Sequence, residues 1–447
     1  MKSMRYYVLL ALLLLLGGYA FYSFVIKEKP PLLTVESPVI TSSLDTDEQS
    51  GIHTSTKSRK NGLNRLSNHT DSSQKHKFDT TKTKSGDLQY GIDREGGSKL
   101  NPYRGRRVNI AVIGVDARVG TSTKHADANH IVSILLDSGK IEIISIPRDT
   151  PADAGFSDTN AQNKLTIVHA NRGIKAYLTE AAKIANVGKI DYYAEFGFSQ
   201  AMGIIELLGH KDSKSTLQVL RSRQGLGGDD YQRCYNQGQF IRQNLLRNFD
   251  RADGFFGDLL VRAGLLLVET NLTADNIKTL VNQLKDKGFP RDSSAITVRV
   301  RPPMGTKFKV YDFSDDVTIA QLKSKIEKYN ASRNRKDTTY AGSKPPNVAP
   351  TLLKAIYNAR LDSIKRPKQV VRKLTTYFNQ HAWLQVTDKK QRDQIRNDIE
   401  ALLADAWTRL DKPHESERVH AVISAEKQLF EQREKQDKQS KTVRNSH

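Results

Sequence analysis

The hydrophobic pattern divides this chain of 447 residues into four regions. Residues 6–26 are almost free of polar groups and, as a helix, would be long enough to cross a bilayer. Residues 30–104 are rich in Ser, Thr, Lys, Asp and Gly, which predicts a flexible linker. We therefore expect an anchor at 1–29, a linker at 30–104, an α/β domain at 105–305 and a basic, mainly helical extension at 306–447.

The apolar segment at 6–26 has two interpretations. Lys2 and Arg5 precede it, which favours a cytoplasmic N-terminus, with the bulk of the chain outside a cell membrane that is crossed once. A cleaved signal peptide is the alternative, because Gly18-Tyr19-Ala20 resembles a cleavage site. Apolar residues continue past that site to residue 26, so an uncleaved signal anchor is the favoured prediction.

Three apolar runs, VNIAVIGVDAR, HIVSILLD and KIEIISIP, predict neighbouring strands that begin near residue 106. Asp137-Ser138-Gly139 supplies a hairpin turn between the last two runs. Helical and strand-like segments alternate after them as far as about residue 302, which predicts an α/β fold with a mixed sheet flanked by helices. Beyond about residue 310 the apolar spacing is helical.

Charged residues stand at the ends of the three predicted strands. If the strands are antiparallel neighbours, one side of the sheet carries Asp116, Arg118, Asp127, Arg148 and Asp149. Two carboxylates without clustered Cys or His suit Mg²⁺, which phosphate oxygens help to hold. Arginines beside them would bind those phosphates. Each residue alone is more consistent with a solvated loop than with a site, so the prediction depends on their convergence.

A second cluster lies in RSRQGLGGDDYQRCYNQGQ, which carries Arg221, Arg223, Asp230, Arg233 and Gln237. Its glycines allow the backbone to approach a ligand closely. Arg233 and Gln237 are four residues apart and share a face if the segment is helical, with Asp230 as the expected cap. A basic surface loop followed by an ordinary helix is the alternative interpretation.

The overall charge narrows the class of partner. Seventy Lys and Arg against 49 Asp and Glu give a net charge of +21, which favours anionic partners. No nucleic-acid partner is expected, because the predicted membrane segment directs the domain across the bilayer and no nucleic-acid motif is recognised. The one cysteine, Cys234, excludes an intrachain disulfide and argues against a Cys-based zinc site.

Blocks in order over about residues 106–285 resemble the LytR–CpsA–Psr family. They are NIAVIGVDAR, ADANHIVSILLDSGKIEIISIPRDT, NKLTIVHANRG, IDYYAEFGFSQAMGIIELLG and VLRSRQGLGGDDYQRCYNQGQ, followed by VETNLTADNIKTLV. The resemblance implies a membrane-anchored enzyme that moves a glycan phosphate from a polyprenyl-pyrophosphate carrier to a hydroxyl of a cell-envelope acceptor such as peptidoglycan. It also implies Mg²⁺ as cofactor.

The resemblance implies roles for ten residues. Catalytic roles fall to Asp116, Asp127, Arg148 and Asp230, and metal binding to Asp116 and Asp127. Pyrophosphate binding falls to Arg118, Arg148, Lys164, Arg221, Arg223, Arg233 and Gln237. Asp127 and Asp230 are both candidates for the group that accepts the acceptor's proton.

The chain departs from the family pattern at three positions. His125 and Asn236 stand where the family commonly has arginine, and His210 stands where a glycine often ends the central helix. Two charges of the usual phosphate site are thus missing. Two alternatives to transfer therefore stay open, a non-catalytic binder of prenyl-linked or anionic glycan and a pyrophosphate hydrolase.

Overall fold

The computed structural model describes residues 88–99, 103–121, 124–157, 161–226, 228–249, 261, 264–333 and 347–445. The predicted anchor at 6–26 and most of the predicted linker lie outside these residues. Among the helices that the structure describes, none is both long and apolar enough to span a bilayer.

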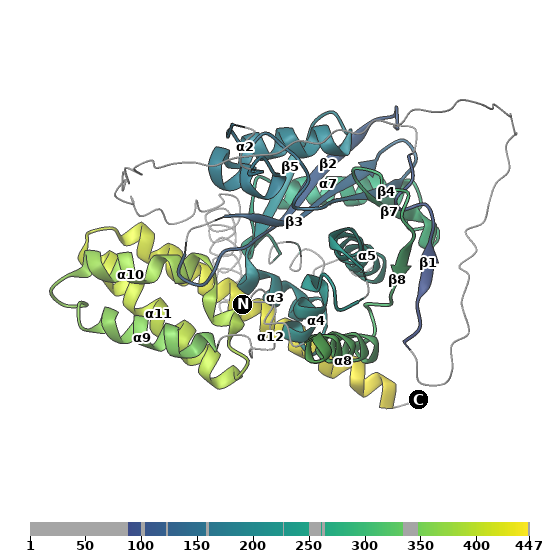
Figure 1. Ribbon diagram of the computed structural model, residues 1–447. Helices are drawn as coiled ribbons and strands as arrows, with labels where there is room; N and C mark the ends of the chain where they lie inside the picture. The colour runs from purple at the N-terminus through teal and green to yellow at the C-terminus, as the bar shows by residue number, and fades with distance from the viewer. Residues whose placement is uncertain are drawn as a thin grey trace, which may run out of the picture.

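A six-stranded mixed sheet forms the centre of the fold, in the order β6-β5-β2-β3-β4-β7 (Figure 1). The three predicted strands are antiparallel neighbours, as expected. Parallel strands β5 and β7 then extend the sheet on either side of these three. The bounds are β2 Arg107–Val115, β3 Ala126–Leu135, β4 Lys140–Ile146, β5 Tyr192–Phe196, β6 Glu269–Thr270 and β7 Ile296–Val300.

Helices cover both faces of the sheet. On one face, α2 (Leu165–Ala185) packs against Ile113, Ile131 and Ile144 of three adjacent strands. On the other, α5 (Asp230–Asn248) and α7 (Ala274–Asp286) cover Ile143 and Val298. Figure 1 shows the sheet between α2 and α5. Alternate strand residues therefore enter different cores, which is why these strands are apolar on both sides. The predicted α/β class is confirmed.

The expected linker ends earlier than the composition indicates. Residues Gly91–Asp93 form strand β1, which pairs with β8 (Phe308–Val310) in a separate two-stranded sheet. The Asp93 carboxylate accepts a hydrogen bond of 2.6 Å from Tyr235 Oη, and the Tyr235 ring stacks on Phe308 at 4.4 Å between centroids. The polar composition of this segment does not indicate a strand. The strand is held by backbone hydrogen bonds and one aromatic contact, which composition does not reveal.

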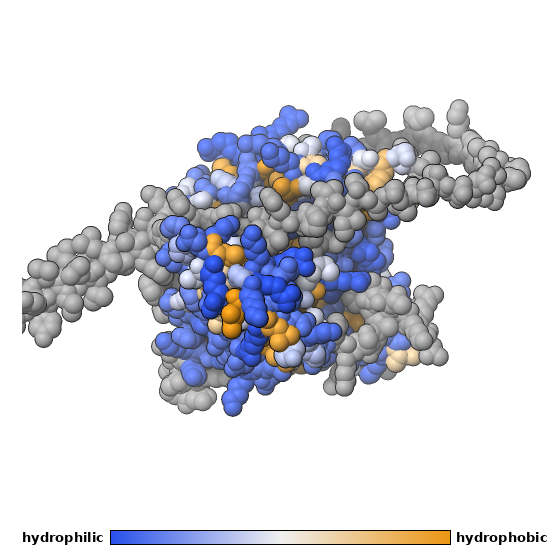
Figure 2. Space-filling model, turned by 90° about the vertical axis from the view of Figure 1, so that its left-hand side faces the viewer, coloured by the Kyte–Doolittle hydropathy of each residue, from blue (hydrophilic) through white to orange (hydrophobic). Residues whose placement is uncertain are grey.

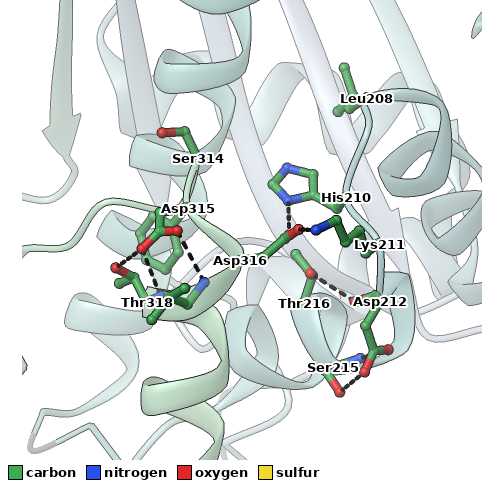
Figure 3. A network of polar contacts seen from close by, with 12 residues as sticks. Leu208, His210, Lys211, Asp212, Ser215, Thr216, Ser314, Asp315, Asp316 and Thr318 are labelled. Atoms are coloured by element: carbon green, nitrogen blue, oxygen red, sulfur yellow. Dashed lines mark hydrogen bonds and ion pairs between the residues drawn. The ribbon is translucent and has the colours of Figure 1, made fainter. Parts of the chain in front are cut away.

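Residues beyond the predicted boundary at 305 also pack on elements of the α/β region. Helix α8 (Asp316–Arg333) packs on α4 (Ser213–Arg221) rather than on the C-terminal helices, and shares a core with Ile205 of α3 (Phe198–Leu207). Figure 3 shows the polar side of this contact, where Asp316 faces His210 and Lys211 at 3.9 Å. The Asp212 carboxylate caps α4 through a 2.9 Å hydrogen bond from Ser215 N. This contact fixes the helix that ends on Arg221.

The remaining helices form a C-terminal bundle on the other side of α3 (Figure 1). Its core surrounds the fully buried Trp383 and takes in Leu207 of α3. Its elements are α9 Val348–Arg360, α10 Pro367–Asn379, the 3₁₀ turn η4 Ala382–Gln385, α11 Lys389–Arg409 and α12 Pro413–Asn445. A second 3₁₀ turn, η3 at Ser293–Ala295, precedes β7.

Candidate functional site

Asp127 stands at a β-bulge between β2 and β3. Gly114 pairs with Ala128 and Val115 pairs with Ala126, so Asp127 is the extra residue on its strand. A bulge bends the strand and re-aims the side chain of the extra residue. Here the Asp127 Oδ1 accepts a hydrogen bond of 2.8 Å from Arg148 Nη1 at the end of β4. The end of the sheet thus joins two of the residues that the sequence predicted.

Arg148 extends this contact to a small network. Its Nε lies 3.6 Å from Asp149 Oδ2, and Lys164 Nζ lies 3.4 Å from Asp149 Oδ1. Burial acts to lower the pKa of Arg148, but the charges of Asp127, Asp149 and Asp230 outweigh it and raise that pKa. The guanidinium therefore stays charged, and it has three carboxylates around it.

A second network comes from the start of α5. Asp229, not Asp230, caps this helix, accepting hydrogen bonds from the backbone N–H groups of Tyr231 and Gln232. The expectation that Asp230 caps the helix is therefore wrong. Asp230 instead meets Arg233 Nη2 at 2.6 Å and Arg223 Nε at 3.5 Å.

The two networks meet at the bulge. Arg233, with only 3% of its side chain exposed, donates from Nη2 to the Asp127 carbonyl oxygen at 3.5 Å. The bulged strand and the start of α5 therefore bring Asp127, Arg148, Arg233 and Asp230 to one place. The antiparallel strand order predicted that Asp127 and Arg148 would lie together, and α5 adds Arg233 and Asp230 to them.

Several buried polar atoms of this cluster lack a hydrogen bond. Among the described residues they are Arg148 Nε, Arg223 Nε, Arg233 Nε and both Asp230 carboxylate oxygens. Asp230 Oδ1 is close to Arg233 Nη2, but the two atoms are not oriented as a hydrogen bond. The three guanidinium groups have donors that an anionic ligand could accept from, whereas the two Asp230 oxygens are acceptors that such a ligand would not meet.

Gln237 and Arg221 flank this cluster. Gln237 donates from Nε2 to the Leu220 carbonyl at 3.0 Å, and its Oε1 lies 3.2 Å from His130 Nε2. The Arg221 guanidinium carbon lies 3.8 Å from the centroid of the Phe198 ring, at the start of α3. Both residues link α4 to neighbouring elements at the edge of the predicted site.

His130 is a buried titratable group beneath the site that the sequence prediction did not include. Its Nδ1 lies 2.9 Å from Ser145 Oγ, and burial lowers its pKa from 6.5 to about 4. His130 therefore takes up a proton near pH 6.5 in the unfolded chain, but only near pH 4 in the folded chain. We expect the free energy of unfolding to fall by about 3 kcal/mol over that interval.

This prediction can be checked by chemical denaturation at a series of pH values. A His130→Gln variant keeps a polar side chain and removes the titration. Its stability should fall less steeply than that of the parent chain between pH 7 and about pH 4. Parallel pH profiles for the two proteins would contradict the assignment.

Asp116 and Arg118 lie on the loop after β2, and the C-terminal bundle holds this loop. Gln380, at the end of α10, accepts a 2.9 Å hydrogen bond from Gly120 N. Its Nε2 donates to the carbonyl oxygens of Arg118 and Thr121 at 3.1 and 2.7 Å. The site loop is therefore held from a helix about 260 residues later in the chain.

Gly120 explains the close fit of this loop. Its φ is +81°, and a Cβ there would lie 2.9 Å from the Tyr377 ring. The left-handed backbone and the ring both favour glycine at this position. Arg118 itself is exposed, and no contact joins its guanidinium to the other predicted site residues among those described.

The predicted metal ligands are compatible with a hard cation. Asp116 and Asp127 flank the same end of the β2–β3 pair, since Asp116 N donates to the His125 carbonyl at 2.8 Å. Asp127 uses one oxygen for Arg148, whereas no described residue pairs with the Asp116 carboxylate. In the described part of the chain no three His, Cys, Asp or Glu side chains group as a metal site. Any Mg²⁺ held here would take phosphate oxygens as further ligands.

The departures from the family pattern have different surroundings. His125 is exposed on the strand end, whereas Asn236 is buried and accepts a 2.8 Å hydrogen bond from Gln232 Nε2. Asn236 therefore contributes to the α5 core rather than replacing a phosphate ligand. Burial raises the pKa of Cys234 to about 12, so its thiol stays neutral and is not a nucleophile.

Comparison with known proteins finds one family model that matches part of the chain. A model of the LytR_cpsA_psr family matches residues 64–210, which include Asp116, Asp127, Arg148 and Lys164. No curated protein matches the chain.

Solved structures give more distant likenesses. A crystal structure of TagV from B. subtilis is 16% identical, with 51% of this chain and 98% of that chain covered and a TM-score of 0.36. A crystal structure described as a transcriptional regulator from Enterococcus faecalis is 17% identical, covering 52% and 93% with a TM-score of 0.35. A structure of TagT bound to LI-WTA is 15% identical, covering 52% and 93% with a TM-score of 0.31.

Proposed function

The chain carries a domain of the LytR–CpsA–Psr family, and on this premise we propose that it transfers a glycan phosphate from a polyprenyl-pyrophosphate carrier to a hydroxyl of a cell-envelope acceptor such as peptidoglycan. In this proposal residues 6–26 anchor the chain in the cell membrane, with a cytoplasmic N-terminus and the remaining domains outside. The proposed cofactor is Mg²⁺, held by Asp116 and Asp127.

One observation carries the proposal. Arg148, Arg223 and Arg233 meet at the sheet end around two carboxylates, and each has a buried Nε without a hydrogen-bond partner. Guanidinium groups bind phosphate oxygens through paired N–H donors. Three guanidinium groups at one place suit a ligand that has two linked phosphates better than they suit a ligand that has a single carboxylate.

The proposed chemistry is a phosphoryl transfer that these residues could support. The acceptor oxygen attacks the glycan-linked phosphorus, the bond to the bridging oxygen breaks, and polyprenyl phosphate leaves. The acceptor's proton passes to a carboxylate of the site, Asp127 or Asp230. The arginines neutralise charge that develops on the phosphate oxygens. A bound Mg²⁺ would supply further neutralisation at those oxygens.

Lipid retained by the purified full-length chain tests the ligand class. Mass spectrometry of extracted lipid should find a polyprenyl phosphate or pyrophosphate with the parent chain and much less with an Arg148→Ala variant. Arg172→Ala is the matched control, because Arg172 pairs with Asp153 at an exposed place on α2. Absence of such lipid from gently purified protein would contradict the proposal.

The proposed orientation has its own test. A topology reporter fused to the C-terminus should report from outside the cytoplasm, because residues 6–26 would then cross the membrane once. A cytoplasmic signal would contradict both the transferase and the glycan-binder hypotheses.

Gln380 gives a prediction about the position of the site loop. A Gln380→Ala variant loses the hydrogen bonds to Arg118, Gly120 and Thr121, so the loop would no longer hold Asp116 in place. We expect turnover to fall by about tenfold with little change in melting temperature. Gln391→Ala, at an exposed position of α11, is the control. Equal turnover in both variants would show that the loop holds its position without the bundle.

A non-catalytic binder is the second candidate. It is favoured by the two missing arginine charges, because His125 is exposed and Asn236 is turned to an internal partner. Binding of a prenyl-linked glycan without release of polyprenyl phosphate, in the presence of Mg²⁺ and acceptor, would favour this function. Release of polyprenyl phosphate in the absence of an acceptor would favour the hydrolase.

A further inference from the structure

The C-terminal bundle carries an exposed apolar stripe. Seven large apolar side chains are exposed in the described part of the chain, and four of them lie on α9 and the turn after it. These four, the apolar stripe, are Leu353, Tyr357, Leu361 and Ile364, with 41, 63, 65 and 76% exposed. Their spacing of four, four and three residues places them along one side of the helix and its continuation. Figure 2 shows apolar residues framed by hydrophilic ones on this side of the molecule.

The stripe is additional to the face that α9 needs for packing. Leu352, Ile356 and Ala359 already bury a neighbouring side of the helix in the bundle core. A helix that packs one apolar face and exposes a second one is unusual in a soluble domain, where large exposed apolar groups mark interaction surfaces.

Basic residues frame the stripe. Residues 347–380 contain seven Lys and Arg and a single acidic residue, Asp362. That carboxylate is buried and pairs with Lys373 Nζ and Arg366 Nη2, both at 2.6 Å. Lys354, Lys365 and Lys368 are exposed beside the apolar side chains. The surface therefore presents positive charge without an exposed acidic group of its own segment.

The turn that ends the stripe is held in place. The pairs of Asp362 connect the turn after α9 to the first part of α10, and Lys373 Nζ also donates to the Asn358 carbonyl at 2.9 Å. Leu361 and Ile364 flank this anchored carboxylate and point to solvent. Their exposure is thus a property of a packed turn.

We propose that the apolar stripe docks on a bilayer surface that contains anionic phospholipid. Large apolar side chains with flanking lysines are the combination that binds such interfaces, the first by insertion and the second by attraction to the head groups. A soluble anionic polymer would use the lysines but leave the apolar side chains in water. The inference goes beyond the transfer reaction and does not depend on it.

Docking would orient the site as well. Helix α10 runs from the turn at Arg366 to Gln380, which holds the loop of Asp116 and Arg118. Its 13 residues span about 20 Å. A bilayer contact at the turn would therefore set the distance between the membrane surface and the candidate site.

An environment-sensitive fluorophore tests the contact in the full chain. Cys234 is fully buried, so a cysteine introduced by Ile364→Cys can be labelled selectively. The protein is reconstituted into vesicles with or without phosphatidylglycerol. The fluorophore should shift to the blue and be quenched by nitroxide lipid only in the anionic vesicles. Val317→Cys on α8, where Val317 is 63% exposed, is the matched control and should show neither change.

The lysines beside the apolar stripe give a second test of the proposal. Changing Lys354, Lys365 and Lys368 to glutamine should weaken docking by about fivefold for each lysine. Emission at position 364 equal to that at 317 in both vesicles would overturn the proposal. A response at 364 to soluble anionic polymer but not to vesicles would overturn it too, and would assign the surface to the polymer. Neither result depends on transfer activity, so failure here leaves the proposed function untouched.

Discussion

An Arg148→Ala variant is expected to transfer glycan phosphate about two to three orders of magnitude more slowly than the parent chain. Arg148 is held at the sheet end by Asp127 at 2.8 Å, so its position costs no rearrangement when a phosphate arrives. Three nearby carboxylates keep its guanidinium charged. Alanine removes every donor that this residue could offer to a transferring phosphate.

The measurement is the rate at which polyprenyl phosphate is released, with the melting temperature followed in parallel. Arg148→Lys keeps the charge but loses the paired donors, and should recover only part of the rate. Arg172→Ala should leave the rate unchanged, since its partner Asp153 lies on the surface. If Arg148→Ala kept its rate while Arg233→Met lost it, the phosphate would lie nearer to α5 than to β4.

Much of the sheet end could be predicted from the sequence, because it depends on local patterns. Apolar runs with a short turn at Gly139 specify antiparallel neighbours, and antiparallel neighbours bring Asp127 and Arg148 to one edge. The helical spacing predicted beyond about residue 310 agrees with α11, where Ile395, Ile399 and Leu403 are buried. These features follow from the periodicity of side chains along the backbone.

Other features depend on contacts that local patterns do not encode. Asp229 and Asp230 are adjacent and either could cap a helix, so only the packing of α5 decides that Asp230 faces the arginines. The bulge that presents Asp127 is set by the register of two strands. Gln380 is polar and far from the site in sequence, and nothing in its neighbourhood indicates the loop that it holds.

Arg233 and Asp230 give the second large effect. Arg233→Met removes the 2.6 Å partner of Asp230 and leaves a largely buried carboxylate with Arg223, at 3.5 Å, as its nearest cation. We expect a loss of about 3 kcal/mol in the free energy of unfolding. Asp230→Asn in the same chain should restore part of this loss, because the poorly compensated charge is then gone.

A double-mutant cycle by chemical denaturation measures the coupling between the two residues. Strict additivity of the two single changes would show that the pair contributes nothing as a pair.

The same variants separate stability from ligand binding. In the parent chain added pyrophosphate should raise the melting temperature, because a ligand that binds only the folded state stabilises it. The double variant Asp230→Asn with Arg233→Met should fold but respond much less, since its main buried phosphate donor is missing. An equal response in both proteins would place the phosphates elsewhere and reduce this pair to a structural contact. A response confined to the parent chain would make Arg233 a ligand-binding residue whose charge Asp230 balances until the phosphate arrives.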